Sequence, residues 1–544
     1  MKLLKKSLVL LLALVLIAGC QSAPEKEPNE TGGTTEEKNS VTIATDTDIQ
    51  TMDLSLATDG TSFVAINLGF AGLVEMDANN QPIPDIAKSW EVNEDKTKYV
   101  FNLVDTAWSN GESVTAHDFV YSWRRLLDPS VASEYAFIMS VVGVKNASAV
   151  NSGEMAPEEL GVVALDDKTL EVTLDKPCDF FLGLLAFPSF FPLNEKFVEE
   201  QGDQYATSVD KMLYSGPYVM ESWIPGNGYE FVRNEGYFNP EAAPMDNVNF
   251  RFIQDSQTAM LEYQSGNIDV VKLSGEMVDA YSSDPGFTTR LQGYLWYLSM
   301  NFEVETLQNN KLRHAISYAV DRETIATLVL KDGSVAAKGI IPIVLATGPD
   351  GKDFRDSVGE LVSYDPEKAA ELYEEAKAEL GSDVTLELLF EDTEASKAVA
   401  EYIQSNLETN LPGMTVTLNS KPKKTRLQLQ QNQEYEVALH RWGPDYSDPQ
   451  TYLDLFLTGS VNNYGKYESE EYMNLMMEAT EGETATDSSA RWELLKQAEE
   501  LLIKEDMAVV PVYQNGGAVM INPVIEGIEF HSAGIDNYRH IKLK

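Results

Sequence analysis

Residues 439–454 read LHRWGPDYSDPQTYLD, in which a tryptophan, a Gly-Pro turn and three carboxylates follow one another closely. The residues before Trp442 have the pattern of a strand, and Gly443-Pro444 then turns the chain. Asp445 therefore stands at the end of a strand, where open α/β sheets commonly bind ligands. Taken alone, the stretch is compatible with a catalytic acid pair, a metal site, a solvated turn or a clamp for a cationic group.

The rest of the sequence gives little support to metal or nucleophilic chemistry. It contains no Gly-x-Ser-x-Gly elbow, no P-loop and no Gly-x-Gly-x-x-Gly after a strand. Two cysteines, Cys20 and Cys178, are too few for a cysteine-based metal site. With 86 acidic residues in the chain, a pair of carboxylates is uninformative by itself. The histidines lack the short spacing of a local zinc or nickel site; they are His117, His314, His440, His531 and His540.

The N-terminus is typical of an exported lipoprotein. MKLLKKSLVLLLALVLIAGC (1–20) joins a basic start to a short apolar run, which is the pattern of a signal peptide. Its ending, Ile17-Ala18-Gly19-Cys20, resembles the bacterial lipobox, in which the cysteine carries the lipid. Residues 21–40 have no large apolar side chain and predict a flexible tether. We expect an extracytoplasmic protein, anchored to the cell membrane as a lipoprotein through Cys20.

The net charge of −45 opposes binding to nucleic-acid backbones and to anionic lipid surfaces, because both would be repelled. Cationic and zwitterionic ligands remain possible. With Cys20 assigned to the lipid, Cys178 has no partner for an intrachain disulfide. Stability must therefore come from packed hydrophobic cores.

Strands and helices alternate along the chain and indicate two α/β bodies. Thr115, followed by Asp118, predicts the start of a helix that ends before Pro129. Apolar residues at helical spacing follow from residue 310 to 330, and a further helix should begin after Asp365 and end at Gly381. The strand-like residues 509–521 suggest that the chain returns to an earlier sheet at its C-terminus.

RWGPDYSDPQTYL (441–453) resembles the Trp-x-x-Asp-Tyr motif of the oligopeptide-binding protein family, the family 5 extracellular solute-binding proteins of ABC importers. The resemblance runs from about residue 41 to the C-terminus. Five further segments are similar to the family in the same order: 107–129, 160–174, 215–223, 312–325 and 507–515.

This resemblance implies an α/β fold of the two-lobed periplasmic-binding-protein type, with mixed sheets flanked by helices, a hinge between the lobes and an extra domain. The first lobe would be discontinuous, built from residues 41–82, 210–302 and 515–544. The extra domain would be 83–209, packed on the first lobe, and the second lobe 303–514. A ligand would be enclosed when the lobes close about the hinge.

The resemblance also implies the site. Asp445 would receive the α-ammonium of an extended peptide, and Trp442 would flank the first peptide residues. Backbone groups around Arg441 and Gly443 would pair with the peptide as an added strand. Asp448 and Asp454 would serve the turn and the start of a helix. Weaker candidates for the cleft are Tyr121, Tyr297, Ser299 and Tyr513.

Two departures from the family leave the preferred peptide length open. Phe70-Ala71-Gly72-Leu73 lacks the glutamate that the family often has at the second position. Leu439 replaces a basic residue that in some members meets the carboxylate of a short peptide, and His440 and Arg441 stand beside it.

The resemblance implies a monomeric receptor, without catalytic site, cofactor or metal, that delivers oligopeptides to an ABC permease. Two alternatives remain. The first is a receptor of the same fold for another solute, such as an oligosaccharide, a nickel chelate or haem, because the cleft and not the fold sets the ligand. The second is a secreted hydrolase that uses a pair of carboxylates. Peptide signalling would use the same site as peptide uptake.

Overall fold

The fold is known from a computed structural model, which describes residues 39–273, 275–481 and 483–544. The expected signal peptide, Cys20 and the expected tether up to residue 38 lie outside these residues. Within these ranges, no helix has both the length and the apolar character that a membrane span requires.

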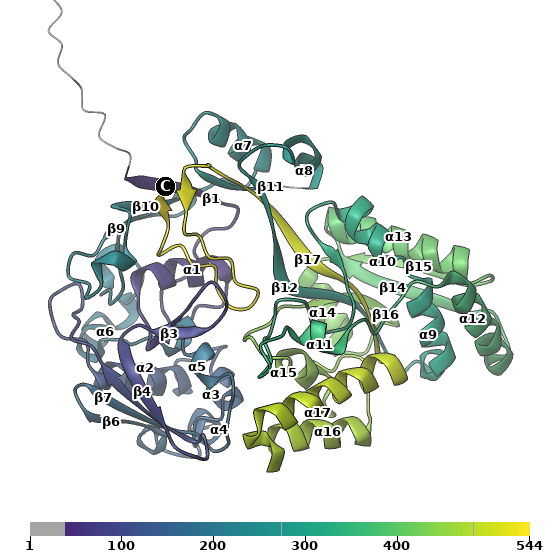
Figure 1. Cartoon of the computed structure of the whole chain (residues 1–544), viewed down its shortest axis with the longest axis horizontal. Helices are drawn as coiled ribbons and strands as arrows, with labels where there is room; N and C mark the ends of the chain where they lie inside the picture. The colour runs from purple at the N-terminus through teal and green to yellow at the C-terminus, as the bar shows by residue number, and fades with distance from the viewer. Residues whose placement is uncertain (1–38, 274, 482) are drawn as a thin grey trace, which may run out of the picture. The chain divides into compact units, whose positions relative to one another are not determined.

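A large mixed sheet runs through the described residues (Figure 1). Its strands follow the order β15-β14-β16-β12-β17-β11-β1-β10-β9-β8, and β13 adds to β17. The bounds are β1 (Ser40–Thr45), β8 (Tyr218–Ile224), β9 (Gly228–Arg233), β10 (Asn247–Phe252), β11 (Val270–Leu273), β12 (Phe287–Met300), β13 (Val335–Ala336), β14 (Thr385–Glu391), β15 (Thr415–Lys421), β16 (Val437–Trp442) and β17 (Val509–Ile521).

Two large hydrophobic cores lie along this sheet. The first is built on β1, β8, β9 and β10, and the second on β12, β14, β16 and the start of β17. Strands β12 and β17 pair with each other over most of their lengths. Their register shifts between Leu291 and Leu295 and again after Trp296. We call the part built on the first core the first lobe and the part built on the second core the second lobe. The expected α/β class is confirmed, and the expected segment boundaries stay predictions.

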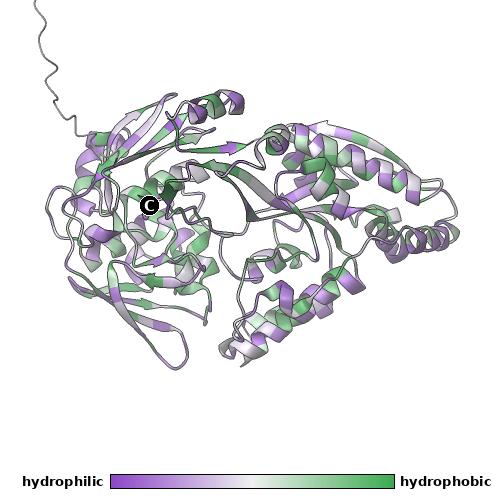
Figure 2. Cartoon of the chain, turned by 45° about the horizontal axis from the view of Figure 1, so that its top comes forward, coloured by the Kyte–Doolittle hydropathy of each residue, from purple (hydrophilic) through white to green (hydrophobic). Residues whose placement is uncertain are grey.

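Helices cover both cores, and Figure 2 shows hydrophilic and hydrophobic residues alternating along them, as expected for helices with one packed side. In the first lobe lie α1 (Gly60–Gly69) and α2 (Ala116–Leu127). In the second lobe lie α9 (Asn310–Ala319), α12 (Pro366–Leu380), α13 (Glu394–Asn410), α14 (Lys423–Gln431), α15 (Gln450–Leu453), α16 (Glu470–Thr480) and α17 (Ser488–Glu500). A smaller cluster near β11 holds α7 (Ser256–Gln264) and α8 (Gly275–Tyr281).

The residues expected to form the extra domain contain a separate sheet of the order β4-β5-β7-β6. Its strands are β4 (Ala87–Val92), β5 (Lys98–Leu103), β6 (Val162–Asp166) and β7 (Thr169–Thr173). Helix α2 begins at the predicted Thr115 cap, because Asp118 Oδ2 accepts the Thr115 backbone N–H at 2.7 Å. Two small antiparallel sheets complete the described strands: β2 (Val74–Met76) with β3 (Pro82–Pro84), and β18 (Ile525–Glu526) with β19 (Lys542–Leu543).

One helix expectation is wrong in its extent. The helical spacing from residue 310 to 330 predicts a single run, but α9 ends at Ala319. Asp321 then caps a new helical segment, because its carboxylate accepts the Thr324 backbone N–H at 3.0 Å. Two other expectations are confirmed: α12 runs from the Asp365 cap to Gly381, and β17 pairs with β11 of the first lobe.

Candidate functional site

Strand β16 carries the Trp-Gly-Pro-Asp stretch to the boundary between the lobes. It lies between β12 and β14, and the four residues from Val437 to His440 are buried. The chain then turns at Gly443, where a Cβ atom would collide with the Tyr294 ring, so that a larger residue would force this ring to move. Asp445 follows directly after this turn.

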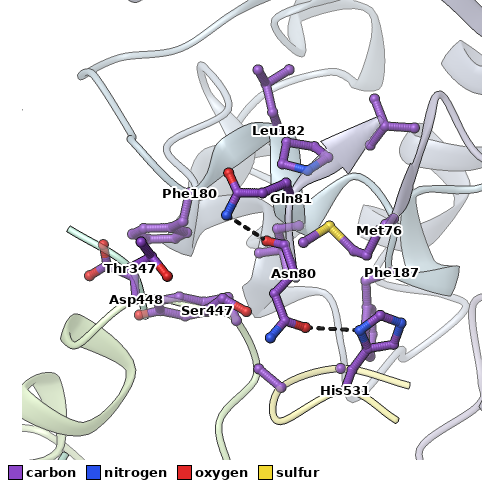
Figure 3. A pocket seen from close by; sticks show the side chains of 18 of the residues that line it. Met76, Asn80, Gln81, Phe180, Leu182, Phe187, Thr347, Ser447, Asp448 and His531 are labelled. Atoms are coloured by element: carbon purple, nitrogen blue, oxygen red, sulfur yellow. Dashed lines mark hydrogen bonds between the residues drawn. The ribbon is translucent and has the colours of Figure 1, made fainter. Parts of the chain in front are cut away.

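A cavity of about 450 Å³ lies between the two lobes (Figure 3). Asp445 is one of the residues that line it. This volume lies in the range of small-ligand sites, about 300–1,000 Å³. Figure 3 shows Asn80 between Gln81 and His531, with hydrogen bonds to both. The lining comes from segments far apart in the sequence: 74–82, 179–191, 344–349, 445–448, 488–492 and 531–539, with Asn67.

The Asp445 carboxylate is unpaired within the described residues, where it makes no hydrogen bond and no ion pair. Its backbone N–H donates to Thr451 Oγ1 at 3.3 Å, which fixes the main chain and leaves both carboxylate oxygens free. Burial raises the pKa of Asp445 to about 6. A buried, unpaired carboxylate at the wall of an enclosed cavity is suited to receive a cationic ligand group.

The other two carboxylates of the stretch are engaged by the protein. Asp448 forms a bidentate ion pair with Arg491, with hydrogen bonds of 2.8 and 2.9 Å. Both side chains are only 6% exposed. Asp448 Oδ1 also accepts the Gln450 backbone N–H at 2.9 Å, as expected for a turn residue. Asp454 accepts from Gln450 Nε2 at 2.9 Å, and burial raises its pKa to about 6. Asp445 alone is therefore available to a ligand.

The residues expected beside Asp445 are not among those that line the cavity. Trp442 is partly buried against the second core, and its carbonyl oxygen accepts the Tyr452 hydroxyl at 3.1 Å. The Arg441 guanidinium lies over the rings of Tyr294 and Trp296, at 5.4 and 5.3 Å from their centroids. Arg441, Trp442 and Gly443 are thus grouped with Asp445 by one strand and its turn, and their roles stay predictions.

The four weaker candidates lie elsewhere. Tyr297 and Tyr513 are buried in the second core, and Ser299 Oγ is 3.2 Å from the Tyr435 hydroxyl. Tyr121 lies on α2, partly buried against the first core. The structure does not bring these residues to the cavity that Asp445 lines, and their ligand contacts stay predictions.

Both positions at which the sequence departs from the family lie within the described residues. Leu439 is fully buried in the second core. Burial, helped by the charge of Arg426, lowers the pKa of the neighbouring His440 well below its usual value, so His440 is neutral. Near Ala71, a different acid reaches the cavity: Glu75 lines it. Burial alone would raise the pKa of Glu75, but its hydrogen bonds from His540 and Asn537 and the charge of Arg539 outweigh this effect and lower it to about 2.

Glu75, Glu529 and His540 also form the one group of the described residues whose atoms could together hold a metal ion, all within 4.8 Å of one another. Asn537 Nδ2 already donates to both glutamates at 2.8 Å. The Arg539 guanidinium contacts Glu75 and also donates to Asp85 Oδ2, at 3.0 Å. The Arg539 guanidinium already neutralises the negative charge of these carboxylates, which a metal ion would need. We therefore interpret this group as structural and not as a metal site.

An aromatic contact across the cavity was not predictable from the sequence. Phe180, which precedes α5 (Phe181–Leu184), stacks on Tyr446 with the ring centroids 4.0 Å apart and the rings 8° from parallel. Tyr446 follows β16 of the second lobe, yet it packs within the first core. Because Tyr446 is the neighbour of Asp445, this stack fixes the loop that carries the carboxylate. In the sequence, Phe180 stands at the start of the aromatic-rich stretch FFLGLLAFPSFFPLN (180–194), which carries no sign of a contact with Tyr446.

The comparisons with known proteins agree with this geometry. Residues 81–464 match the model of the bacterial extracellular solute-binding proteins, family 5. The chain is 32% identical to a dipeptide-binding protein of Lactococcus lactis, over 98% of both chains. It is 39% identical to the substrate-binding domain of an oligopeptide ABC transporter from Bacillus anthracis, with a TM-score of 0.77, covering 93% of this chain and 99% of that one. The peptide-bound OppA of Listeria monocytogenes is 32% identical, with a TM-score of 0.76 and coverage of 93% and 99%.

An unpaired, buried carboxylate in a cavity between two lobes is suited to bind a small cationic solute. The chain belongs to the family 5 extracellular solute-binding proteins, and its fold is that of the two-lobed periplasmic binding proteins. Of the similar proteins described above, the first is named as a dipeptide-binding protein, the second belongs to an oligopeptide ABC transporter, and the third was solved with a bound peptide.

Proposed function

We propose that this protein is a lipid-anchored, extracytoplasmic receptor that captures oligopeptides between its lobes and delivers them to an ABC permease. The observation that carries the proposal is the unpaired Asp445 carboxylate in the cavity between the lobes. The lipid would be attached to Cys20. The protein binds its ligand without changing it chemically and is therefore not an enzyme.

The binding step follows from the cost of enclosing a charge. An α-ammonium that leaves water needs a carboxylate partner, and Asp445 needs a cation for the same reason. The two groups therefore stabilise each other only when the lobes enclose them. Backbone groups next to Arg441 and Gly443 would pair with the peptide main chain, which gives affinity without reading its side chains.

The ligand class is tested by purifying the lipoprotein from its native membrane and identifying what it releases on denaturation by mass spectrometry. We expect peptides with free N-termini. Release of a glycan, a metal chelate or haem, in amounts equal to the protein, would contradict the proposal. Labelling with a radioactive fatty acid tests the anchor: the Cys20→Ala variant should lose the label.

Peptide affinity should fall as the pH drops below 6. Burial raises the pKa of Asp445 to about 6 in the empty protein, so the carboxyl becomes neutral and no longer attracts the ammonium. The affinity should fall by up to about tenfold for each pH unit between 6 and 4. Calorimetry over this range measures it, and an equal slope for Asp445→Asn would assign the effect to another group.

The raised pKa of Asp445 also affects the stability of the ligand-free protein, which should be higher at low pH, whereas peptide affinity should be lower there. The neutral Asp445 carboxyl tolerates burial, so its contribution to stability is complete below about pH 4, the usual range of the group, and is lost as the pH rises through about 6. Ligand binding should therefore raise the melting temperature more at pH 7 than at pH 5.

Removal of the Phe180 ring should speed ligand release. The stack joins Phe180 to Tyr446 in the loop after β16, so opening of the lobes is expected to break it, and a stacked, buried ring contributes about 1–2 kcal/mol. Phe180→Ala should therefore weaken binding by about 5- to 30-fold, mainly through the dissociation rate. Stopped-flow release of a fluorescent peptide measures this rate.

Lys176→Ala is the matched control, because Lys176 also reaches the second lobe from the extra domain. It pairs with Glu481 at 3.2 Å, but the two side chains are 36% and 62% exposed, and such pairs contribute little. We expect less than about a twofold change. Equal effects of the two variants would show that the stack does not hold the lobes together.

A further inference from the structure

We propose, on the basis of the proposed function, that the cavity beside Asp445 receives the side chain of the ligand's first residue and selects uncharged, mainly apolar side chains. The inference goes beyond peptide binding in general, because it assigns a preference to one position of the peptide. It follows from the reach of the ammonium, from the charges of the cavity wall and from the apolar groups on it.

The reach of the ammonium places the first residue. A charge-assisted hydrogen bond to Asp445 puts the nitrogen about 2.8 Å from a carboxylate oxygen, and the Cα atom is one bond of about 1.5 Å further on. The first side chain therefore begins within about 5 Å of a carboxylate that lines the cavity. At about 450 Å³ the cavity has room for a large side chain.

The charged groups of the cavity wall are already paired by the protein. Glu75 is held by His540 and Arg539, and Arg539 also by Asp85. Asp448 is held by Arg491.

The cavity wall has two further ionisable groups, Asp179 and His531. Asp179 pairs with Lys96 at 3.2 Å. Burial lowers the pKa of His531, which keeps it neutral at pH 7. Once the ammonium occupies Asp445, the described lining offers no unpaired charge to a second ligand charge. A charged first side chain would lose its water without gaining a partner.

The uncharged part of the wall is rich in apolar groups. Figure 3 shows Met76, Phe180, Leu182 and Phe187 around the cavity, with Asn80 and Gln81 among them. Trp492 adds a further ring. Apolar and aromatic ligand groups gain most from such a lining, because it removes their surface from water.

The preference is tested by calorimetry with two host series, X-Ala-Ala and X-Ala-Ala-Ala-Ala, in which X is Ala, Leu, Phe, Glu or Lys. We expect Leu and Phe peptides to bind at least tenfold more tightly than Glu and Lys peptides of the same length, with Ala in between. Affinities equal within twofold across X would overturn the proposal. If Asp445→Asn abolished binding of all of them, the proposed function would stand, whereas no binding by any peptide of either length would count against both.

A change of the wall provides the second test. Leu182 lines the cavity and is only partly buried, so Leu182→Glu should fold and should add an unpaired carboxylate to the wall. The preference should then shift toward Lys by at least tenfold relative to Leu. Leu165→Glu is the matched control, because Leu165 lies on β6 and is 54% exposed, outside the cavity lining. A shift of equal size in both variants, or in neither, would overturn the assignment of the cavity to the first side chain.

Discussion

Replacement of Asp445 by asparagine should remove most of the peptide affinity and leave the fold intact. The ligand ammonium would be enclosed without its carboxylate, and truncation of one partner of a buried charge pair costs about 2–5 kcal/mol. This corresponds to a loss of about 30- to 4,000-fold in affinity. The free energy of unfolding of the empty protein at pH 7 should stay the same or rise, because the wild-type carboxylate is buried without a partner.

Calorimetry measures the affinity, and urea denaturation measures the free energy of unfolding. Asp179→Asn is the control for a general effect of negative charge: Asp179 lines the same cavity, but it is paired with Lys96 and is expected to change affinity only a few-fold. Binding by Asp445→Asn within a few-fold of wild type would contradict the assignment of the ammonium.

Asp448→Ala should have the opposite pattern, with a large loss of stability. The substitution leaves the Arg491 guanidinium buried without its carboxylate, and a buried ion pair that loses one partner costs about 3–5 kcal/mol. The midpoint of urea denaturation should fall accordingly. The double variant Asp448→Ala/Arg491→Met should regain part of the loss, because it removes the unpaired charge as well.

If the midpoint of urea denaturation of Asp448→Ala equalled that of the wild type, the ion pair would not stabilise the fold. Asp445 and Asp448 are three positions apart in one loop and are the same residue type. Their expected effects differ because one carboxylate is left for the ligand and the other is bonded by the protein.

Local signals in the sequence predicted much of the fold. The Thr115–Asp118 capping box, the Asp365 cap with Gly381 at the end of α12, and the return of the C-terminal strand are each confirmed. These features depend on neighbouring residues or on strand pattern alone. The break after Ala319 was missed because Asp321 caps a new helical segment, while the apolar spacing continues past it.

The site was predictable only where one segment carries it. Asp445 and its turn stand in a single stretch, and the resemblance to the family picked out this carboxylate from three. Phe180 and Arg491 reach the same cavity from distant segments, and no local pattern marks them. Tyr297 and Tyr513 were candidates for the cleft through the resemblance alone. Both are buried in the second core, and their ligand contacts stay predictions.

The most direct measurement compares one natural ligand with and without its positive charge. Calorimetry should be carried out at pH 7 with a peptide identified from the native protein and with the same peptide acetylated at its N-terminus. If Asp445 receives the ammonium, acetylation should weaken binding by at least about 30-fold, as an enclosed carboxylate loses its partner. Equal affinity of the two peptides would contradict the account.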